Sequence, residues 1–405
     1  MADVTALEVL LYGVPVGTLT RVQGDRTLFT FHDDYIQDEN RAVLGLGFKD
    51  QFGQLITEFP SYQTRVMPFF SNLLPEGRMR TYLARLAGVD SKREFFLLWA
   101  LGGDLSGAIT IRSAEGDDWP LQTDEGEHDG REHHARALRF SLAGVQLKFS
   151  ALGEMRSGLS IPAKGIGGSW IIKLPSLEFE GVPENEYSMM TLARLLGMDV
   201  PALDLVDIDA IDNLPEGLGR LKGQALVIER FDRLPDGRGE HIEDFAQVFG
   251  VYPEAKYNKG STRSIARVIG AEGTLNDIGE FIRRLTFNTL IGNGDMHLKN
   301  WSLIYPDQRR AALAPAYDFV STIAYLPYDQ AALKVSRTKR FDEFTEDELS
   351  HLAAKARLPE RLVLDTARET VALFHQYWQA EKNHLPLTQD VIDAIDSHIK
   401  KIPMV

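Results

Sequence analysis

Two carboxylates and an amide towards the end of the chain have the types and the order that phosphoryl transfer requires. Asp295 and Asn300 lie in one short segment, DMHLKN, and Asp318 follows in the segment YDF. In such a site one Asp accepts the proton of the acceptor hydroxyl, while the Asn and a later Asp hold Mg²⁺ against the phosphates. Asn300 follows Asp295 by five positions, as this arrangement requires. We therefore predict that Asp295 is the catalytic base and that Asn300 and Asp318 are Mg²⁺ ligands.

Local patterns predict elements that bring these side chains together. A helical pattern over 276–291 ends at the turn-forming Gly-Asn-Gly of 292–294, which would project Asp295 from a rigid element. A strand-like segment at 301–305, a turn and a return segment would then bring Asp318 back beside the first segment. Magnesium requires this proximity because it prefers oxygen ligands in near-octahedral geometry.

Each residue taken alone also has an ordinary structural explanation. Asp295 could be a turn or cap former, His297 a hydrogen-bonded structural histidine, and Asp318 a solvated turn residue. The occurrence of several role-compatible residues in the expected order favours the phosphoryl-transfer interpretation.

Residues upstream supply a candidate ATP site. Lys173 lies in the strand-like Trp-Ile-Ile-Lys and could bind the α- and β-phosphates, with Glu186 on the next helix as its partner. A strand-edge lysine and an exposed helix-start acid are the alternatives. The segment at 141–148, SLAGVQLK, matches neither a Walker A nor a GxGxxG loop, yet its backbone N–H groups could cover phosphates. The Glu229-Arg230-Phe231 segment leaves a predicted strand and would present backbone groups to adenine, although an ordinary strand exit is equally consistent.

The composition is that of an ordinary globular protein, with 405 residues of which 44% are hydrophobic. The absence of Cys excludes disulfides and thiolate metal sites, and it fits a reducing compartment. We find neither an apolar run of membrane-spanning length nor a signal peptide, so we expect a cytoplasmic protein without a membrane partner. The net charge of −14 argues against nucleic acid as the main substrate, although it does not exclude a local basic patch.

Patterns along the chain predict an α+β protein with a β-rich start. Alternating apolar residues at 7–18 predict a hairpin, and 27–31 predicts a third strand. Helical patterns follow at 71–87 and 92–101. The acidic segment at 114–136 is nearly free of aliphatic residues and is the best linker candidate.

The rest of the chain predicts a protein-kinase-like two-lobed fold. Strands and one helix are expected over 137–233, and helices dominate over 234–405, notably at 276–291 and 347–382. We therefore predict a β-rich N-terminal subdomain, an acidic linker, a small kinase lobe and a helical kinase lobe, at 1–113, 114–136, 137–233 and 234–405. Nucleotide would lie in the cleft between the two lobes.

Motifs in order along nearly the whole chain resemble the HipA family, serine/threonine kinase toxins of bacterial toxin–antitoxin modules. They are LLPEGRMR, ALGGDLSGA, SLAGVQLK, IIKLP, ENEY, VIERFDR, EDFAQ, IGNGDMHLKN and AYDFVS. The resemblance implies a kinase fold behind a β-rich N-terminal subdomain, with ATP and Mg²⁺ as cofactors. It also implies the roles given above to Asp295, Asn300, Asp318 and Lys173.

The resemblance further implies the remaining nucleotide contacts. The phosphate loop would consist of Ala143, Gly144, Val145, Gln146, Leu147 and Lys148. The adenine hinge would contain Glu229, Arg230 and Phe231. The rest of the nucleotide-contacting residues would be His297, Leu298, Lys299 and Asn300, with Tyr317 beside Asp318.

What the resemblance implies about regulation depends on Ser141, just before the phosphate loop. Phosphorylation of the matching serine displaces that loop in the family and silences the kinase, and a dianionic phosphate there would repel those of ATP. The implied partner is a HipB-like helix-turn-helix antitoxin, through which the chain would meet operator DNA indirectly. Known family targets include an aminoacyl-tRNA synthetase, so we expect a translation-related protein substrate.

Departures from the founding toxin's pattern occur at Met296, in place of Gly, and at Leu147, in place of Glu. The first adds a side chain to the catalytic loop and the second removes a charge from the phosphate loop. Neither removes a role-bearing residue, so we expect activity, with target choice or turnover open. A basic run at 334–340 could touch DNA, although a surface segment balanced by Asp342 and Glu343 is favoured. Two other functions stay open: a kinase of the same fold acting on a small molecule or lipid, and a non-catalytic corepressor.

Overall fold

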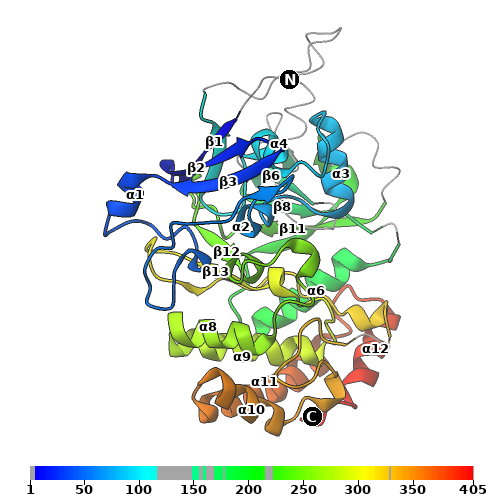
Figure 1. The fold of residues 1–405 in the computed structure, drawn as a ribbon. Helices are drawn as coiled ribbons and strands as arrows, with labels where there is room; N and C mark the ends of the chain where they lie inside the picture. The colour runs from blue at the N-terminus through cyan, green and yellow to red at the C-terminus, as the bar shows by residue number, and fades with distance from the viewer. Residues whose placement is uncertain are drawn as a thin grey trace.

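The structure is a computed structural model that describes residues 5–115, 148–154, 158–160, 168–176, 178–214, 222–327 and 330–404. These residues form an α+β fold, as the sequence predicts. Figure 1 shows the strands gathered in one half of the molecule and the helices α8 to α12 in the other, with α6 between them. Ser141, the phosphate-loop positions 143–147 and most of the predicted linker lie outside the described residues.

The N-terminal part is a five-stranded antiparallel sheet with the strand order β4-β3-β2-β1-β5. Its strands are β1 Ala6–Leu11, β2 Val14–Val22, β3 Arg26–Phe31, β4 Tyr62–Gln63 and β5 Ile109–Ser113. The predicted hairpin and third strand are therefore confirmed. Helices α1 Asp33–Gln37, α2 Pro68–Ser71, α3 Gly77–Leu86 and α4 Glu94–Leu101 accompany the sheet. The helix predicted from residue 71 begins only at Gly77, because Pro75 disfavours helical backbone at the residue before it.

The next part is a six-stranded sheet with the order β10-β7-β6-β8-β11-β9. Its strands are β6 Lys148–Glu154, β7 Gly158–Ser160, β8 Trp170–Lys173, β9 Leu203–Asp207, β10 Ile211–Asp212 and β11 Gln224–Glu229. Strands β6 and β8 pair antiparallel with Lys148 opposite Lys173. Helix α6, Val182–Leu195, connects β8 to β9 and packs against β11 and β9.

The last part is mainly helical. Its helices are α7 Phe245–Val248, α8 Thr262–Glu272, α9 Leu275–Leu290, α10 Glu346–Ala356, α11 Glu360–Glu381 and α12 Gln389–Ile399. A small sheet is formed by β12 Ile242–Asp244, β13 Ser302–Ile304 and β14 Ala312–Leu313. The helical stretch expected at 347–382 is two helices, because Arg357 adopts left-handed backbone at φ 60° and Pro359 caps the next start. None of the helices in the described ranges has the length and apolar content needed to cross a membrane.

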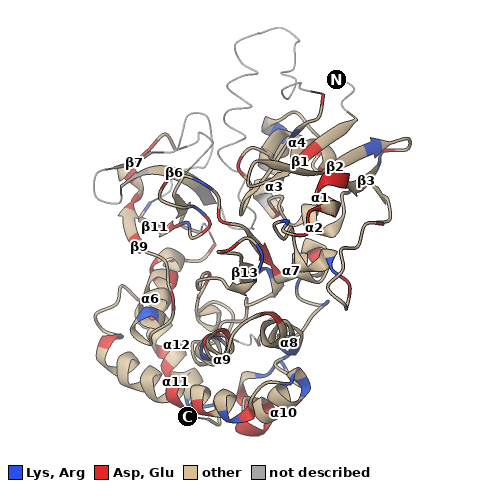
Figure 2. Ribbon diagram, turned by 90° about the vertical axis from the view of Figure 1, so that its left-hand side faces the viewer, with Lys and Arg blue, Asp and Glu red and all other residues tan. Residues whose placement is uncertain are grey.

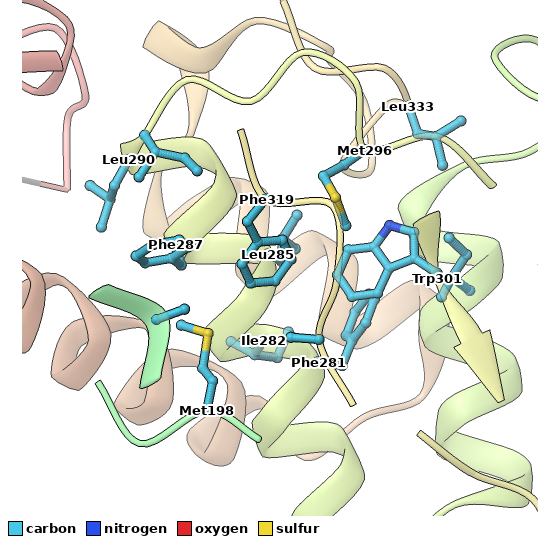
Figure 3. Close-up of a cluster of buried hydrophobic side chains, with 14 of the residues drawn as sticks. Met198, Phe281, Ile282, Leu285, Phe287, Leu290, Met296, Trp301, Phe319 and Leu333 are labelled. Atoms are coloured by element: carbon cyan, nitrogen blue, oxygen red, sulfur yellow. The ribbon is translucent and has the colours of Figure 1, made fainter. Parts of the chain in front are cut away.

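Two hydrophobic clusters hold the described parts together. One is centred on the helical part and includes Phe281, Phe287 and Phe319, which Figure 3 shows around α9; it extends to buried residues of α6 and of the second sheet. The other joins the N-terminal sheet to the second sheet, because Ile172 and Val227 of the latter are buried in it. The N-terminal part and the sheet that carries Lys173 therefore share one continuous hydrophobic core.

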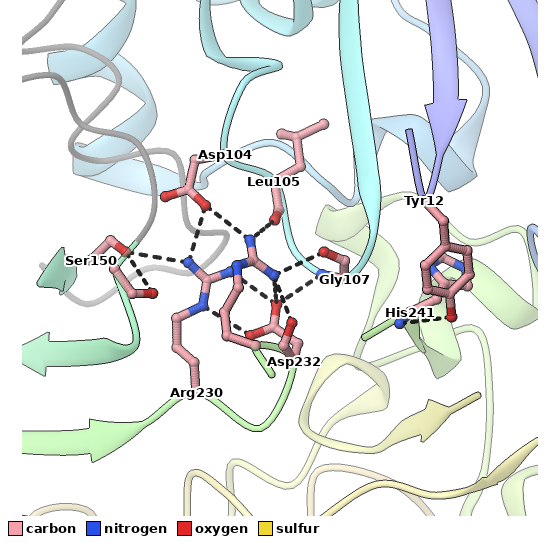
Figure 4. Close-up of polar contacts among 10 residues, drawn as sticks. Tyr12, Asp104, Leu105, Gly107, Ser150, Arg230, Asp232 and His241 are labelled. Atoms are coloured by element: carbon pink, nitrogen blue, oxygen red, sulfur yellow. Dashed lines mark hydrogen bonds and ion pairs between the residues drawn. The ribbon is translucent and has the colours of Figure 1, made fainter. Parts of the chain in front are cut away.

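A buried ionic network reinforces that junction (Figure 4). The guanidinium of Arg230, at the end of β11, lies 2.9 Å from Asp232 Oδ1 and 3.1 Å from Asp104 Oδ1 of the N-terminal part. Arg233 approaches both carboxylates at 2.9 Å, and the Gly107 N–H donates to Asp232 Oδ2 at 2.8 Å. Burial opposes the charge on Asp232, yet Arg230 and Arg233 lower its pKa to about 2. The chain leaving β11 is thus tied to the N-terminal part.

Replacing Arg230 with Ala should leave the buried carboxylates of Asp104 and Asp232 with one guanidinium fewer to balance their charge. We expect the free energy of unfolding in urea to fall by about 3–5 kcal/mol. The control is Arg238→Ala, since the pair of Arg238 with Asp236 is exposed and its loss should leave the midpoint unchanged. Equal midpoints for the two variants would contradict this account of the junction.

Candidate active site

A cavity of about 610 Å³ lies between the second sheet and the helical part. Eleven of the residues predicted from the sequence line it. One is Glu186 of α6, and the others are Lys173, Glu229, Arg230, Phe231, Asp295, His297, Lys299, Asn300, Tyr317 and Asp318. They come from β8, from the exit of β11, from the segment after α9 and from the end of the β13–β14 hairpin. Segments far apart in the sequence therefore meet at one hollow, as the sequence analysis expects.

Lys173 is the most constrained of these residues. Its side chain is buried, and its Nζ forms ion pairs with Glu186 of α6 and with Asp318. Burial alone would lower the pKa of Lys173, but the carboxylates of Asp318 and Glu186 outweigh that effect and raise it. The expected partnership with Glu186 is thus present, and the lysine remains a cation. Lys173 is therefore not an exposed lysine at the edge of a strand, which was the alternative interpretation.

Asp295 is held by the turn that follows α9. Gly292 has φ 65°, and a Cβ there would lie 2.6 Å from Ile323, so only glycine fits this turn. The Asp295 N–H donates to Asn293 Oδ1 at 3.0 Å. The Asn300 side chain donates from Nδ2 to the Asp295 carbonyl at 2.9 Å. These bonds fix the backbone while the Asp295 carboxylate remains exposed to the cavity.

Asp318 is returned to the site by the predicted hairpin. Strands β13 and β14 pair antiparallel. The Tyr317 hydroxyl then donates to the Lys299 carbonyl at 2.8 Å and lies 2.6 Å from Ser302 Oγ. Asp318 itself has left-handed backbone at φ 57°, a conformation that a non-glycine residue adopts only when its surroundings enforce it. The hairpin therefore aims Asp318 at Lys173.

The donor set suits a magnesium ion that is shared with phosphates. Asn300 uses its amide nitrogen on the Asp295 carbonyl, which leaves Oδ1 as its oxygen for a metal. Asp318 lines the same cavity and supplies a carboxylate. Among the described residues, no group of three His, Cys, Asp or Glu side chains could hold a metal by itself. Two protein oxygens fit Mg²⁺, which keeps waters and phosphate oxygens as its other ligands.

His297 faces the cavity from the same segment but is buried. Burial, with the charge of Lys256 nearby, lowers the pKa of His297 to about 3, so the ring is neutral at pH 7. Its Nδ1 has no hydrogen-bond partner among the residues that the structure describes. These facts describe a neutral ring with an unsatisfied Nδ1 that lines the cavity beside Asp295.

Other predicted nucleotide contacts differ in how they face the cavity. Phe231 lies with its ring centroid 5.7 Å from that of Tyr317, at the cavity wall. Arg230 also lines the cavity, but its guanidinium is engaged by Asp232 and Asp104. Leu298 is fully buried in the hydrophobic cluster and is not among the lining residues, so only its backbone could meet a nucleotide.

Met296 turns away from the site. Its side chain is 7% exposed and belongs to the hydrophobic cluster of the helical part. Figure 3 shows it pointing towards Trp301, with Leu333 nearby. The departure from Gly at this position therefore adds core packing and does not fill the cavity.

A buried charge cluster beside Asp295 was not predicted from the sequence. Glu76, at the start of α3 in the N-terminal part, lies 2.9 Å from Lys256 Nζ and 3.0 Å from Lys299 Nζ. Burial alone would raise the pKa of Glu76, but Lys299 and Lys256 lower it to about 2. The N-terminal part thus supplies a carboxylate to the site and fixes the lysine that precedes Asn300.

The basic run at 334–340 is largely neutralised. Arg337 pairs with Asp347 and Glu348, and Arg340 pairs with Asp342 and Glu343. In the view of Figure 2, Lys and Arg are interspersed with Asp and Glu and do not form one basic face. The favoured interpretation as a balanced surface segment is consistent with these pairs.

Models of two protein families match the chain in consecutive order. Residues 7–112 match the HipA N-terminal domain, and residues 140–378 match the HipA-like C-terminal domain. The chain belongs to the HipA family. The resemblance inferred from the motifs is confirmed.

Relatives of this HipA-family chain are named as kinases. Y4dM of Sinorhizobium fredii, named as a kinase, is 59% identical over 407 residues, covering 100% of this chain and 98% of that protein. The serine/threonine-protein kinase toxin HipA of Shewanella oneidensis is 26% identical, covering 81% of this chain and 78% of that protein.

A solved structure shares the fold of this HipA-family chain. It belongs to a complex of Shewanella oneidensis HipA and HipB with operator DNA, and it aligns with a TM-score of 0.71 at 22% identity. The alignment covers 98% of this chain and 95% of that one. The predicted α+β, kinase-like two-lobed fold with a β-rich N-terminal subdomain is therefore confirmed.

Replacing Glu76 with Gln should destabilise the protein, because two buried lysines lose their carboxylate. The displacement of the Glu76 pKa from 4.5 to about 2 corresponds to a loss of about 3 kcal/mol at pH 7 in the free energy of unfolding. Since the folded pKa lies below the unfolded one, this stabilisation is present above pH 4.5 and disappears as the pH falls through 2.

Urea unfolding at pH 7 and near pH 3 measures this effect, and the difference between wild type and variant should shrink at the lower pH. Glu58→Gln is the matched control, since Glu58 is an exposed glutamate of the same part of the chain. Equal stabilities of Glu76→Gln and wild type at pH 7 would show that the cluster contributes nothing.

Proposed function

We propose that this chain is an ATP-dependent serine/threonine protein kinase and the toxin of a toxin–antitoxin module. The observation that carries the proposal is the buried Lys173 between Glu186 and Asp318, in one cavity with Asp295 and Asn300. Kinases of this class use a lysine paired with a helix glutamate to hold the phosphates of ATP. The names of the relatives support ATP as the phosphoryl donor.

Each residue has one part in the proposed transfer. Asp295 accepts the proton of the serine or threonine hydroxyl as its oxygen bonds to the γ-phosphorus. The bond from that phosphorus to the oxygen bridging the β-phosphate breaks, and ADP leaves. Lys173 binds the α- and β-phosphates and needs no change of protonation to do so. Catalysis then rests on positioning and on electrostatic stabilisation.

Magnesium completes the proposed site. Asn300 and Asp318 would hold the ion, which would neutralise charge on the phosphates during transfer. The adenine would lie along Glu229 and Phe231, where β11 ends and two lobes meet. The phosphate loop would span 143–148, and its last residue, Lys148, begins the strand that pairs with β8 opposite Lys173.

The proposal also covers the domain boundaries of the chain. We propose domains at 1–113, 137–233 and 234–405, with a linker at 114–136.

We propose that the kinase is regulated at Ser141. Phosphorylation of Ser141, which precedes the phosphate loop, would switch the kinase off, because a phosphate there competes with those of ATP. The proximity of the loop's end to Lys173 supports this coupling.

The proposed partners follow from the family. The related solved structure contains HipB and operator DNA. We propose a HipB-like helix-turn-helix antitoxin as the partner of this chain, with operator DNA reached through it. The proposed substrate is a translation-related protein, such as an aminoacyl-tRNA synthetase, in the cytoplasm.

The alternatives make different predictions for a transfer assay. A non-catalytic corepressor has no need to keep Asp295, Asn300, Asp318 and Lys173 together, so their joint presence disfavours it. Incubation with labelled ATP and Mg²⁺ separates the other two. Label on Ser141 supports the protein kinase, whereas label only on added small molecules supports a small-molecule or lipid kinase.

Replacing Asp295 with Ala should abolish transfer while leaving the fold intact. We expect the rate to fall by about 10²-fold or more, the contribution typical of a positioned general base. Labelled-phosphate transfer measures the loss, and the melting temperature reports the fold. Asp307→Ala, an exposed carboxylate of the β13–β14 turn, is the control. Undiminished transfer by Asp295→Ala would refute the assignment.

Replacing Asp318 with Asn should weaken the use of magnesium. Because the amide is a poorer ligand than a carboxylate, we expect the Mg²⁺ concentration for half-maximal transfer to rise by at least about tenfold. A titration of transfer against Mg²⁺ at fixed ATP measures it, with Asp307→Asn as the control. An unchanged midpoint would remove Asp318 from the metal site.

A further inference from the structure

Tyr257 lies at the atom of Asp295 that an acceptor should use. Its hydroxyl donates a hydrogen bond to Asp295 Oδ1 at 2.5 Å. A serine or threonine acceptor must make a hydrogen bond of this same kind, because the base takes the proton through it. No sequence pattern relates Tyr257 to Asp295, because the two residues are 38 positions apart.

We propose that Tyr257 occupies the acceptor position at Asp295 Oδ1 until a protein substrate displaces it, and that it thereby keeps water from that oxygen of the catalytic base. This inference rests on the proposed kinase function and adds a device that protects ATP from hydrolysis. A kinase base that is open to solvent can activate water when no substrate hydroxyl is bound, and exclusion of water prevents that side reaction.

The backbone that carries Tyr257 is fixed against the catalytic segment. The Leu298 N–H donates to the Lys256 carbonyl at 3.4 Å. A Cβ at Gly260 would lie 2.7 Å from the Leu298 side chain, so this loop packs directly on the segment after Asp295. The loop is therefore a fixed support, and displacement of the hydroxyl requires rotation of the Tyr257 side chain alone.

The ring of Tyr257 is guided by two neighbours. Its centroid lies 4.9 Å from that of His297 in an edge-to-face arrangement, with 82° between the planes. Lys256 Nζ lies 5.6 Å from the ring centroid. Both contacts involve the ring and neither needs the hydroxyl, so Tyr257→Phe should keep the ring in place.

The exposure of the two partners makes displacement feasible. Tyr257 is 37% exposed and Asp295 is also exposed. A single hydrogen bond at a partly exposed site stabilises the resting arrangement only modestly, so an acceptor hydroxyl bound at the cavity can replace it. The reaction that the tyrosine prevents is simple: a water oxygen bonds to the γ-phosphorus, ADP leaves and Asp295 receives the water proton.

The test is ATP hydrolysis by the purified full chain with Mg²⁺ and no protein acceptor. We expect Tyr257→Phe to hydrolyse ATP about fivefold faster than wild type, the factor expected when one competing hydrogen bond is removed. Its affinity for a fluorescent ATP analogue should be unchanged. Tyr252→Phe is the matched control, because that hydroxyl donates to the Val66 carbonyl at 3.0 Å and Tyr252 does not line the cavity.

The opposite outcomes overturn the inference. An unchanged rate would mean that the hydroxyl does not exclude water, and a slower rate would mean that it orients Asp295 for catalysis. Phosphotyrosine at position 257 would make this residue an acceptor in its own right. Asp295→Ala in the same assay tests the underlying function separately, because hydrolysis at the wild-type rate by that variant would refute the kinase site itself.

Discussion

The ion pairs of buried Lys173 are the interaction on which the rest of the site depends. A buried ammonium is costly unless carboxylates face it, and this one faces Glu186 of α6 and Asp318 of the helical part. Those two partners come from elements that are far apart in the sequence. The lysine therefore sets the position of the sheet, of α6 and of the β13–β14 hairpin at once, and it presents a fixed positive charge where phosphates would bind.

The N-terminal part contributes to the same site in two ways. It shares a hydrophobic core with the strands on either side of Lys173, and Asp104 holds the arginine at the exit of β11. Glu76 then pairs with Lys256 and Lys299, which line the cavity near Asp295. The order of a β-rich start followed by the kinase-like lobes makes physical sense on these contacts, because Asn72, Leu73 and Glu76 of the start line the cavity.

The sequence predicts which residues gather at the cavity better than it predicts the residues that support them. Asp295, Asn300, Asp318 and Lys173 carry local signals, namely a glycine turn, a fixed offset, a hairpin and a strand-like flank, and the cavity contains all four. Glu76 and Tyr257 carry no such signal, because their contacts join segments that no pattern relates. The direction of Met296 depends on the packing of Trp301 and its neighbours, and the inward turn of the Arg230 guanidinium depends on Asp104. Tertiary contacts of this kind are invisible to periodicity.

A crystal structure with Mg²⁺ and a non-hydrolysable ATP analogue would test the central claim most directly. We expect adenine beside Phe231, the α- and β-phosphates on Lys173, and Mg²⁺ on Asn300 and Asp318. We also expect space between the γ-phosphorus and Asp295 for an acceptor oxygen, which would lie about 3–3.5 Å from the phosphorus. A nucleotide bound outside this cavity, or a metal that contacts neither Asn300 nor Asp318, would contradict it.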